Sequence, residues 1–194
     1  MMETPITVDG LLIAPATPER WEDLTRLFGE HGASSGCWDM FWRIPRKEYA
    51  RQSGEGNRQA LQALVEGGTI TGLMAYREGE PIGWCSLGPR EAYPILDRSP
   101  VLKRLDDLPV WSIVCFFIAK TARRQGNLLP LLKGALEYAR QQGAKIVEAY
   151  PLESDRKMSA DESYMGRLPV FEQAGFRVVS SPSAHRRVMR VSLE

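Results

Sequence analysis

The apolar segment at residues 110–119, VWSIVCFFIA, most constrains the fold of this chain. It is apolar on both faces and rich in β-branched and aromatic residues, which is typical of a central strand covered on both sides. It leads through the turn ARRQGN into a helix that we expect to end at Gly143. The following strand-like segment, KIVEAYPL, is then parallel to the first strand if the helix is a right-handed crossover.

The rest of the chain supplies more strands and helices around this unit. A short strand precedes Thr17, where Pro18 marks the first turn of a helix with one apolar face, formed by Trp21, Leu24, Leu27 and Phe28. We also expect a helix over 57–68, a hairpin over 71–90, a short helix over 168–176 and an antiparallel pair at 177–181 and 186–193. The sum is a mixed α/β sheet flanked by helices. Because no Pro-, Gly- or Ser-rich linker is long enough to separate two domains, we expect one domain over residues 1–194.

Composition limits the partners of the protein. Its 25 Lys and Arg residues balance 24 Asp and Glu residues, so neither Arg123-Arg124 nor Arg186-Arg187 makes a convincing nucleic-acid site. Three widely spaced cysteines indicate reduced thiols and no metal centre. No apolar run approaches the ~20 residues that span a bilayer, and the N-terminus does not resemble a signal peptide. We therefore expect a cytoplasmic protein without a membrane partner.

The turn before the long helix has the features of a phosphate site. The first N–H groups of a helix lack intrahelical partners, and the helix dipole adds positive charge there. Pro130 fits a helix that begins near Asn127, because its missing N–H would have no helical acceptor. The alternative is a purely structural turn. If the turn binds phosphate, the residues that do so are Arg123, Arg124, Gln125, Gly126, Asn127 and Leu128.

The segment IAKTARRQGNLLPLL resembles the acyl-CoA-binding motif of the GNAT N-acetyltransferases, with Arg123 and Gly126 at the matching positions. VFEQAGFRVV resembles a second marker of that family, matched by Gly175 and Phe176. The resemblance covers about residues 69–179. It implies a mixed, mostly antiparallel sheet with a splayed pair of parallel strands, and acetyl-CoA as co-substrate.

The resemblance also implies roles for residues. The strand before the turn would bind the pantetheine arm through the backbone of Phe116, Phe117 and Ile118, while the pyrophosphate would lie on the turn. Two positions depart from the pattern: Leu128 replaces a small residue, and Phe171 replaces a tyrosine that protonates the departing thiolate in many members.

Acetyl transfer to an amine needs a base, and protonation of the thiolate would need an acid. We expect Glu148 to be the base, although it could be a strand-end carboxylate in solvent. Tyr164 is the candidate acid, with Tyr150 as the other nearby phenol, and either could be packing.

The acceptor side should involve the N-terminal helices, about residues 17–66. Trp38 and Trp42 could form an aromatic wall there, with Trp84 and Arg90 as further candidates, or these side chains could belong to the core. The predicted function is N-acetylation of a small-molecule or peptide amine, and the alternative is a non-catalytic acyl-CoA sensor. A homodimer is compatible with either.

Overall fold

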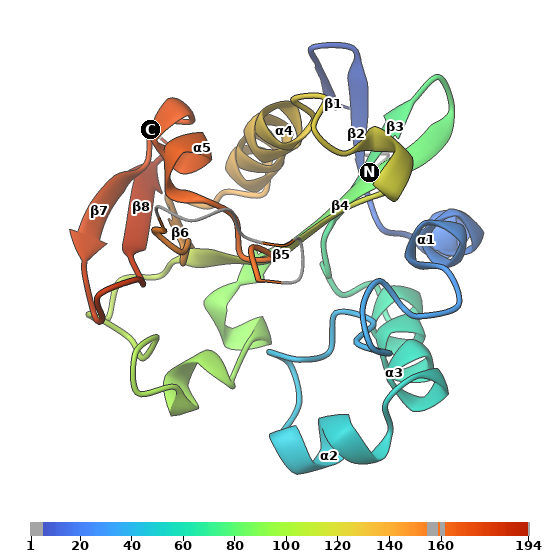
Figure 1. The fold of residues 1–194 in the computed structure, drawn as a ribbon, viewed down its shortest axis with the longest axis horizontal. Helices are drawn as coiled ribbons and strands as arrows, with labels where there is room; N and C mark the ends of the chain where they lie inside the picture. Colours follow the sequence, from blue (N-terminus) through green and yellow to red (C-terminus); the bar gives the residue numbers. More distant parts are fainter. Residues whose placement is uncertain (1–5, 155–158, 160–161, 194) are drawn as a thin grey trace.

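The computed structural model describes residues 6–154, 159 and 162–193, which contain one eight-stranded sheet (Figure 1). The order across the sheet is β1-β2-β3-β4-β5-β6-β8-β7. All neighbouring strands are antiparallel except β5 and β6, which are parallel. The strands are β1 (Ile6–Val8), β2 (Leu11–Pro15), β3 (Leu73–Arg77), β4 (Glu80–Pro89), β5 (Trp111–Ile118), β6 (Ile146–Ala149), β7 (Arg177–Ser180) and β8 (Val188–Ser192).

Within the same described residues, five α-helices accompany the sheet: α1 (Trp21–Phe28), α2 (Arg46–Arg51), α3 (Glu55–Glu66), α4 (Leu128–Gln141) and α5 (Leu168–Gln173). The expected mixed sheet, the hairpin and the crossover helix are confirmed, and so is the buried face of α1. Strand β1 and helix α2 were not predicted. α2 has six residues, which is less than two turns, and buries none of them, which explains its weak signal in the sequence.

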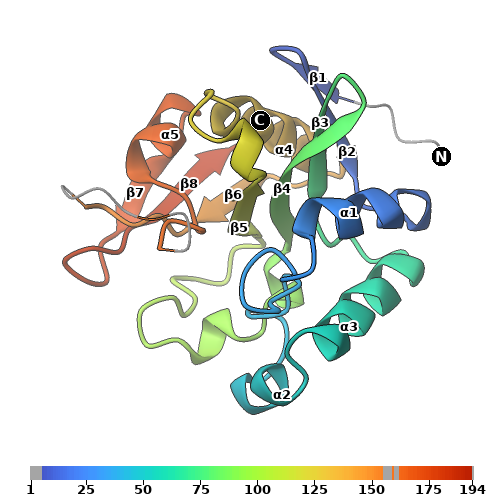
Figure 2. The same ribbon diagram turned by 45° about the vertical axis from the view of Figure 1, so that its right-hand side comes forward.

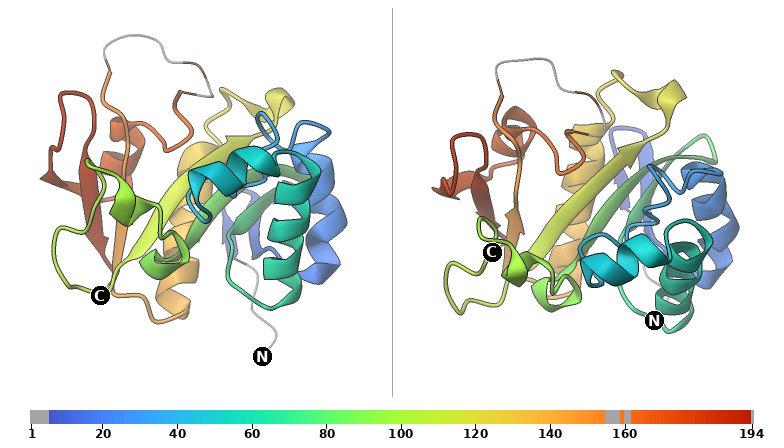
Figure 3. Two further views of the ribbon diagram at one scale, coloured as in Figure 1. Left: turned by 90° about the horizontal axis from the view of Figure 1, so that it is seen from below. Right: turned by 60° about the horizontal axis from the view of Figure 1, so that its bottom comes forward.

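The helices cover opposite faces of the sheet, and α4 and α1 lie on different sides of it in the views of Figures 2 and 3. Strand β3 shows how the sequence arranges this. Leu73 and Ala75 belong to the core cluster that includes α4, whereas Met74 and Tyr76 belong to the cluster that includes α1 and α3. Because successive side chains of a strand point to opposite faces, one strand contributes to both cores.

The parallel pair at the centre of the sheet separates early. β5 pairs with β6 only from Trp111 to Ile113, and β5 then continues to Ile118. Its other edge stays paired with β4 up to Ile118. The second half of β5 therefore offers a free edge on the β6 side. This is the splayed pair that the resemblance to the GNAT family implied.

Gly134 allows α4 to pack closely on the sheet. A Cβ atom at this position would lie 2.5 Å from Cγ1 of Ile13 in β2, and both residues are buried. We expect Gly134→Val to lower the free energy of unfolding by about 1–3 kcal/mol through overpacking. Urea denaturation measures it. The control is Lys133→Val, at an exposed position of the same helix. Equal losses in both variants would contradict close packing at Gly134.

Candidate active site

A cleft of about 810 Å³ lies beside the free half of β5. Its size is ordinary for a small-molecule or cofactor site. One end is formed by the turn between β5 and α4, and the other by the segment that follows α1. The described lining residues are Phe28, Ala33, Ser34, Ser35, Cys37, Asp39, Phe41, Trp42, Tyr49, Trp84, Cys115, Phe116, Phe117, Ile118, Ala122, Arg123, Arg124, Gly126, Asn127, Leu128, Ser159, Ser163, Tyr164 and Arg167.

The turn is held in shape by side chains as well as by backbone. Nδ2 of Asn127 donates to the carbonyl of Ala122 at 2.8 Å, and its Oδ1 accepts from Arg77 at 2.6 Å. Arg124 and Gly126 both have positive φ angles, 60° and 76°. A Cβ atom at Gly126 would meet nothing within 4 Å. Gly126 is therefore needed for its backbone conformation and leaves open space in front of the turn.

The start of α4 leaves backbone donors at the cleft. The helix begins at Leu128, and the N–H of Leu131 is the first to bond within it, to the carbonyl of Asn127 at 3.2 Å. Pro130 has no N–H, so the N–H groups of Leu128 and Leu129 lack acceptors in the helix. Five of the six predicted turn residues line the cleft. The sixth, Gln125, has its side-chain amide bonded to the carbonyl of Thr121 at 2.8 Å.

The free edge of β5 is partly bonded by another segment. The N–H of Phe116 donates to the carbonyl of Tyr164 at 2.6 Å, and the carbonyl of Ile118 accepts from Nε of Arg123 at 2.9 Å. Phe117 is the register partner of Trp84 in the β4–β5 ladder. All three β5 residues expected to bind pantetheine line the cleft. The N–H of Phe116 is already bonded, however, so any ligand must use other groups or displace this contact.

Aromatic side chains form the half of the cleft away from the turn. Phe28 packs edge-on against both Trp84 and Phe117, with ring centroids 5.6 and 5.8 Å apart. Phe41 makes edge contacts with Trp42 at 5.1 Å and Tyr49 at 5.4 Å. Trp42 and Trp84, two of the residues expected on the acceptor side, therefore line the cleft.

Trp38 lies outside this wall. Its ring stacks on Trp21 at 6.2 Å and meets Phe28 edge-on at 5.5 Å, and it is almost completely buried. The expectation that Trp38 lines the acceptor cleft is corrected here, because α1 holds the ring in the core on that face of the sheet.

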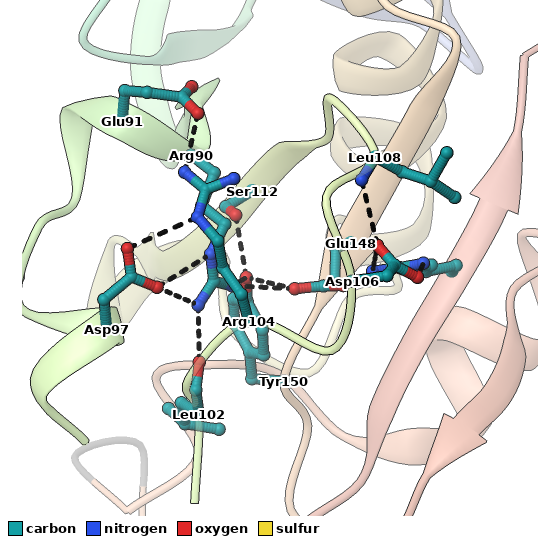
Figure 4. A network of polar contacts seen from close by, with 11 residues as sticks. Arg90, Glu91, Asp97, Leu102, Arg104, Asp106, Leu108, Ser112, Glu148 and Tyr150 are labelled. Atoms are coloured by element: carbon teal, nitrogen blue, oxygen red, sulfur yellow. Dashed lines mark hydrogen bonds and ion pairs between the residues drawn. The ribbon is translucent and has the colours of Figure 1, made fainter. Parts of the chain in front are cut away.

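Arg90 and Glu148 also lie away from the cleft, in a buried polar network (Figure 4). Arg90 pairs with Oε1 of Glu148 at 2.8 Å, and Nε of Arg190 pairs with Oε2 at 2.7 Å. The hydroxyl of Tyr150 donates to Glu148 at 2.8 Å. Both carboxylate oxygens of Glu148 are thus paired with an arginine. Nη2 of Arg90 also pairs with Oδ1 of Asp97 at 2.8 Å. The expected roles of Glu148 as base and Arg90 as substrate ligand do not agree with this placement.

Tyr164 lies in the cleft, as the sequence predicted for the candidate acid. Its ring meets Phe41 edge-on at 6.4 Å. Burial raises the pKa of its phenol to about 12. The hydroxyl therefore stays protonated at neutral pH and could donate a proton. Phe171, at the position of the usual tyrosine, is fully buried against Phe176 and Phe116.

Asp39 also lines the cleft, and the sequence analysis did not single it out. It has a positive φ of 58° and lies inside the aromatic segment, between Trp38 and Phe41. Arg43 pairs with its Oδ2 at 3.0 Å, and the hydroxyl of Ser86 donates to the same atom at 2.7 Å. The sequence signal that could have identified Asp39 is a carboxylate within the apolar, mostly aromatic segment 38–42. That segment is equally typical of a buried core, so the signal does not indicate a functional residue.

Comparison with known proteins agrees with this geometry. Residues 37–160 match the model of the acetyltransferase (GNAT) family, which is more than half of the chain. A search of the curated proteins found no match. The chain belongs to the GNAT acetyltransferase family. Among its described residues, no helix is long and apolar enough to cross a membrane.

Solved structures share the fold at low sequence identity. A GNAT-family acetyltransferase from Streptococcus agalactiae is 13% identical, with a TM-score of 0.58 over 97% of this chain and 99% of that one. Ribosomal-protein-S5-alanine acetyltransferase from Vibrio fischeri is 10% identical, with a TM-score of 0.58 over 99% and 98%. PaiA N-acetyltransferase from Thermoplasma acidophilum, in complex with coenzyme A, is 14% identical, with a TM-score of 0.52 over 94% and 98%.

The Arg90–Glu148 network predicts loss of stability in acid. A hydrogen bond from Arg190 holds the pKa of Asp106 below its usual value. Burial raises the pKa of Asp97, but the contacts with Arg90 and Arg104 outweigh it and lower the pKa. Both carboxyls have a lower pKa in the folded protein than in the unfolded chain. The stability that they contribute is therefore complete at a pH above the unfolded-state pKa, and it is lost as the pH falls through the folded-state pKa. We expect the Tm to fall below about pH 5.

Thermal unfolding of Asp106→Asn across this range tests the assignment. The variant should have a lower Tm than the wild type at neutral pH and a shallower decrease in acid, because one of the linked groups is gone. Glu22→Gln, which changes an exposed carboxylate on α1, is the control. If the Tm of Asp106→Asn decreases in acid as steeply as that of the wild type, the ion pair between Asp106 and Arg190 contributes nothing to the pH dependence of stability.

Proposed function

We propose that this protein is an acetyl-CoA-dependent N-acetyltransferase that acetylates an amine by direct attack. The observation that carries the proposal is one continuous cleft with a basic turn at one end and an aromatic wall at the other. A phosphate-bearing cofactor and a small organic acceptor could therefore lie in the same cleft with their reacting ends together.

The residues at the turn fit coenzyme A. The N–H groups of Leu128 and Leu129 lack helical acceptors, Gly126 leaves open space, and Arg123 and Arg124 add positive charge at the cleft. These groups suit a pyrophosphate. The solved complex of PaiA N-acetyltransferase with coenzyme A, which shares the fold, supports the same cofactor. Bound acetyl-CoA would supply an activated acetyl thioester.

Tyr164 is the proposed acid. Its phenol remains protonated at neutral pH, and its backbone carbonyl is tied to the N–H of Phe116 on β5. This bond fixes Tyr164 against the strand whose edge faces the cofactor. The phenol would give its proton to the thiolate of coenzyme A and recover one from solvent.

The second candidate function is a non-catalytic acyl-CoA sensor, which the phenylalanine at position 171 favours. The two functions differ in one measurement. An enzyme releases free thiol from acetyl-CoA when an amine is added, whereas a sensor binds acetyl-CoA without amine-dependent release.

Gly126→Glu tests the phosphate site. We expect calorimetry to show a Kd for acetyl-CoA at least roughly tenfold weaker, because a carboxylate near the pyrophosphate repels it. The matched control is Gly143→Glu, just beyond the other end of α4. Gly143 also has a positive φ and open space where a side chain would start, but it does not line the cleft. Equal weakening in both variants would attribute the effect to backbone strain.

Tyr164→Phe tests the acid. We expect kcat for thiol release to fall about 100-fold, while the Kd for acetyl-CoA stays within twofold, since only proton donation is removed. Tyr76→Phe is the control, because the Tyr76 hydroxyl bonds to Asp23 outside the cleft. If Tyr164→Phe keeps the wild-type kcat, the thiolate leaves without a proton from this phenol.

A further inference from the structure

Charge is separated along the cleft. Its described basic residues are Arg123 and Arg124 at the turn and Arg167 at the start of α5, whereas Asp39 is its one described acidic residue. Asp39 belongs to the segment that carries the aromatic wall. The aromatic end of the cleft, opposite the turn, therefore contains a single described carboxylate, which is buried among aromatic rings.

The hydrogen bonds of Asp39 leave one oxygen for the cleft. Within the described part of the chain, the bonds from Arg43 and Ser86 all end on Oδ2. Arg43 does not line the cleft, and its guanidinium also donates to the carbonyl of Thr71 at 2.7 Å. Asp39 itself lines the cleft, and a hydrogen bond with the side chain of Trp84, which lines the same end, helps to lower the pKa of its carboxyl. Oδ1, which takes no bond from Arg43 or Ser86, is the oxygen that a ligand beside Trp84 could meet.

Asp39 is the one described carboxylate that lines this end, and a guanidinium, that of Arg46, lies over the rings of Phe41 and Trp42 at 3.1 and 5.0 Å from their centroids. The titratable groups around Asp39 are Arg43, Tyr93 and the thiols of Cys37, Cys85 and Cys115. Burial raises the pKa of all three thiols and of the Tyr93 phenol, so they are neutral at physiological pH. A cation entering the aromatic end would meet one carboxylate as its nearest opposite charge. A neutral or anionic acceptor would give this carboxylate no charged partner beyond Arg43, which bonds to Oδ2.

We propose that Asp39 binds the ammonium group of the acceptor and accepts its proton, and that the acceptor is a cationic amine with an apolar or aromatic body. This inference rests on the proposed acetyltransferase function. The rings of Phe41, Trp42 and Trp84 would hold the apolar body, while Arg46 already lies over the Phe41 ring at 3.1 Å.

The proton balance of the step follows from these positions. The ammonium gives one proton to Oδ1 of Asp39, which passes it to solvent. The neutral nitrogen then forms a bond to the acetyl carbon, the carbon–sulfur bond breaks, and the nitrogen loses its second proton to Asp39. The departing sulfur takes a proton from Tyr164, which solvent restores. The net products are an amide, coenzyme A thiol and one proton in solution.

Asp39 suits this role better than Glu148 for a geometric reason. Glu148 has arginines on both oxygens and does not line the cleft. Burial raises the pKa of Asp39, and the nearby Arg43 offsets part of the rise. A carboxylate with a raised pKa holds a proton more readily, which favours proton acceptance from an amine.

The acceptor class is tested first, on the wild type. Thiol release from acetyl-CoA is measured with 2-phenylethylamine, tryptamine and cyclohexylmethylamine, and with phenylalanine and glutamate, which carry a carboxylate beside the amine. We expect kcat/KM to be at least roughly tenfold higher for the first group. A preference for the carboxylate-bearing amines overturns the inference but leaves the enzyme. No release with any amine, in a protein that binds acetyl-CoA, overturns the proposed function itself.

Asp39→Asn then tests the residue with the preferred amine. We expect kcat/KM at pH 7 to fall at least roughly 100-fold. The loss should shrink as pH approaches the pKa of the amine, because the variant must bind the neutral amine from solution. The Kd for acetyl-CoA should stay within twofold, since the turn is unchanged. A loss that is the same at every pH would indicate a structural role only and overturn the inference.

Tyr93→Phe is the matched control for the buried network. Its hydroxyl contacts Ser86 at 3.1 Å and Arg43 at 3.3 Å but does not line the cleft. This variant should lose stability without the pH-dependent loss of activity. If Asp39→Asn does not fold, because Arg43 is left unpaired, the double variant Asp39→Asn with Arg43→Gln removes both buried charges. The double variant should show the same pH dependence, and a wild-type pH profile would overturn the inference.

Discussion

The rest of the structure depends on the incomplete pairing of β5. Its first three residues pair with β6, and its last five extend beyond that ladder while β4 holds the other edge. A strand edge buried without partners is unfavourable, so the free groups must find other bonds. Phe116 bonds to Tyr164, and Ile118 bonds to Arg123. These two contacts bring the candidate acid and the basic turn to the same side of one strand.

Two buried ion networks fix the segments around this strand, and they differ in what they face. Arg90 joins Glu148 on β6 to Asp97 and to the carbonyl of Leu102, so it ties the 90–108 segment to the sheet. Arg43 joins Asp39 to the carbonyl of Thr71 before β3. Removing one partner of such a pair typically costs about 3–5 kcal/mol, because a charge is left buried. The first network lies away from the cleft, whereas the second includes Asp39, which lines the cleft.

This difference connects the architecture to the proposed chemistry. A group whose hydrogen-bonding capacity is filled by the protein contributes to folding and is unavailable to a substrate, as for Glu148. A carboxylate that is held through one oxygen beside a cavity is oriented and can still meet a substrate, as we propose for Asp39. Tyr164 is oriented in the same way, through its backbone carbonyl, which leaves its phenol in the cleft.

The sequence by itself determined the order of the elements other than β1 and α2, and the turn at Gly126, because these depend on local signals. The motifs around Gly126 and Gly175 indicated the family, and that resemblance implied the splayed pair. Apolar periodicity, glycine conformation and the missing N–H of Pro130 act within a few residues. The tertiary structure decided which polar and aromatic side chains share a cavity. Trp38 and Trp42 are four residues apart, yet one packs on α1 and the other lines the cleft. The sequence singled out Glu148 and passed over Asp39, and the structure separates them: Arg190 and Arg90 bond to both oxygens of Glu148, whereas Asp39 lines the cleft. Those partners come from strands and loops far apart in the chain, so no pattern along the sequence could reveal them.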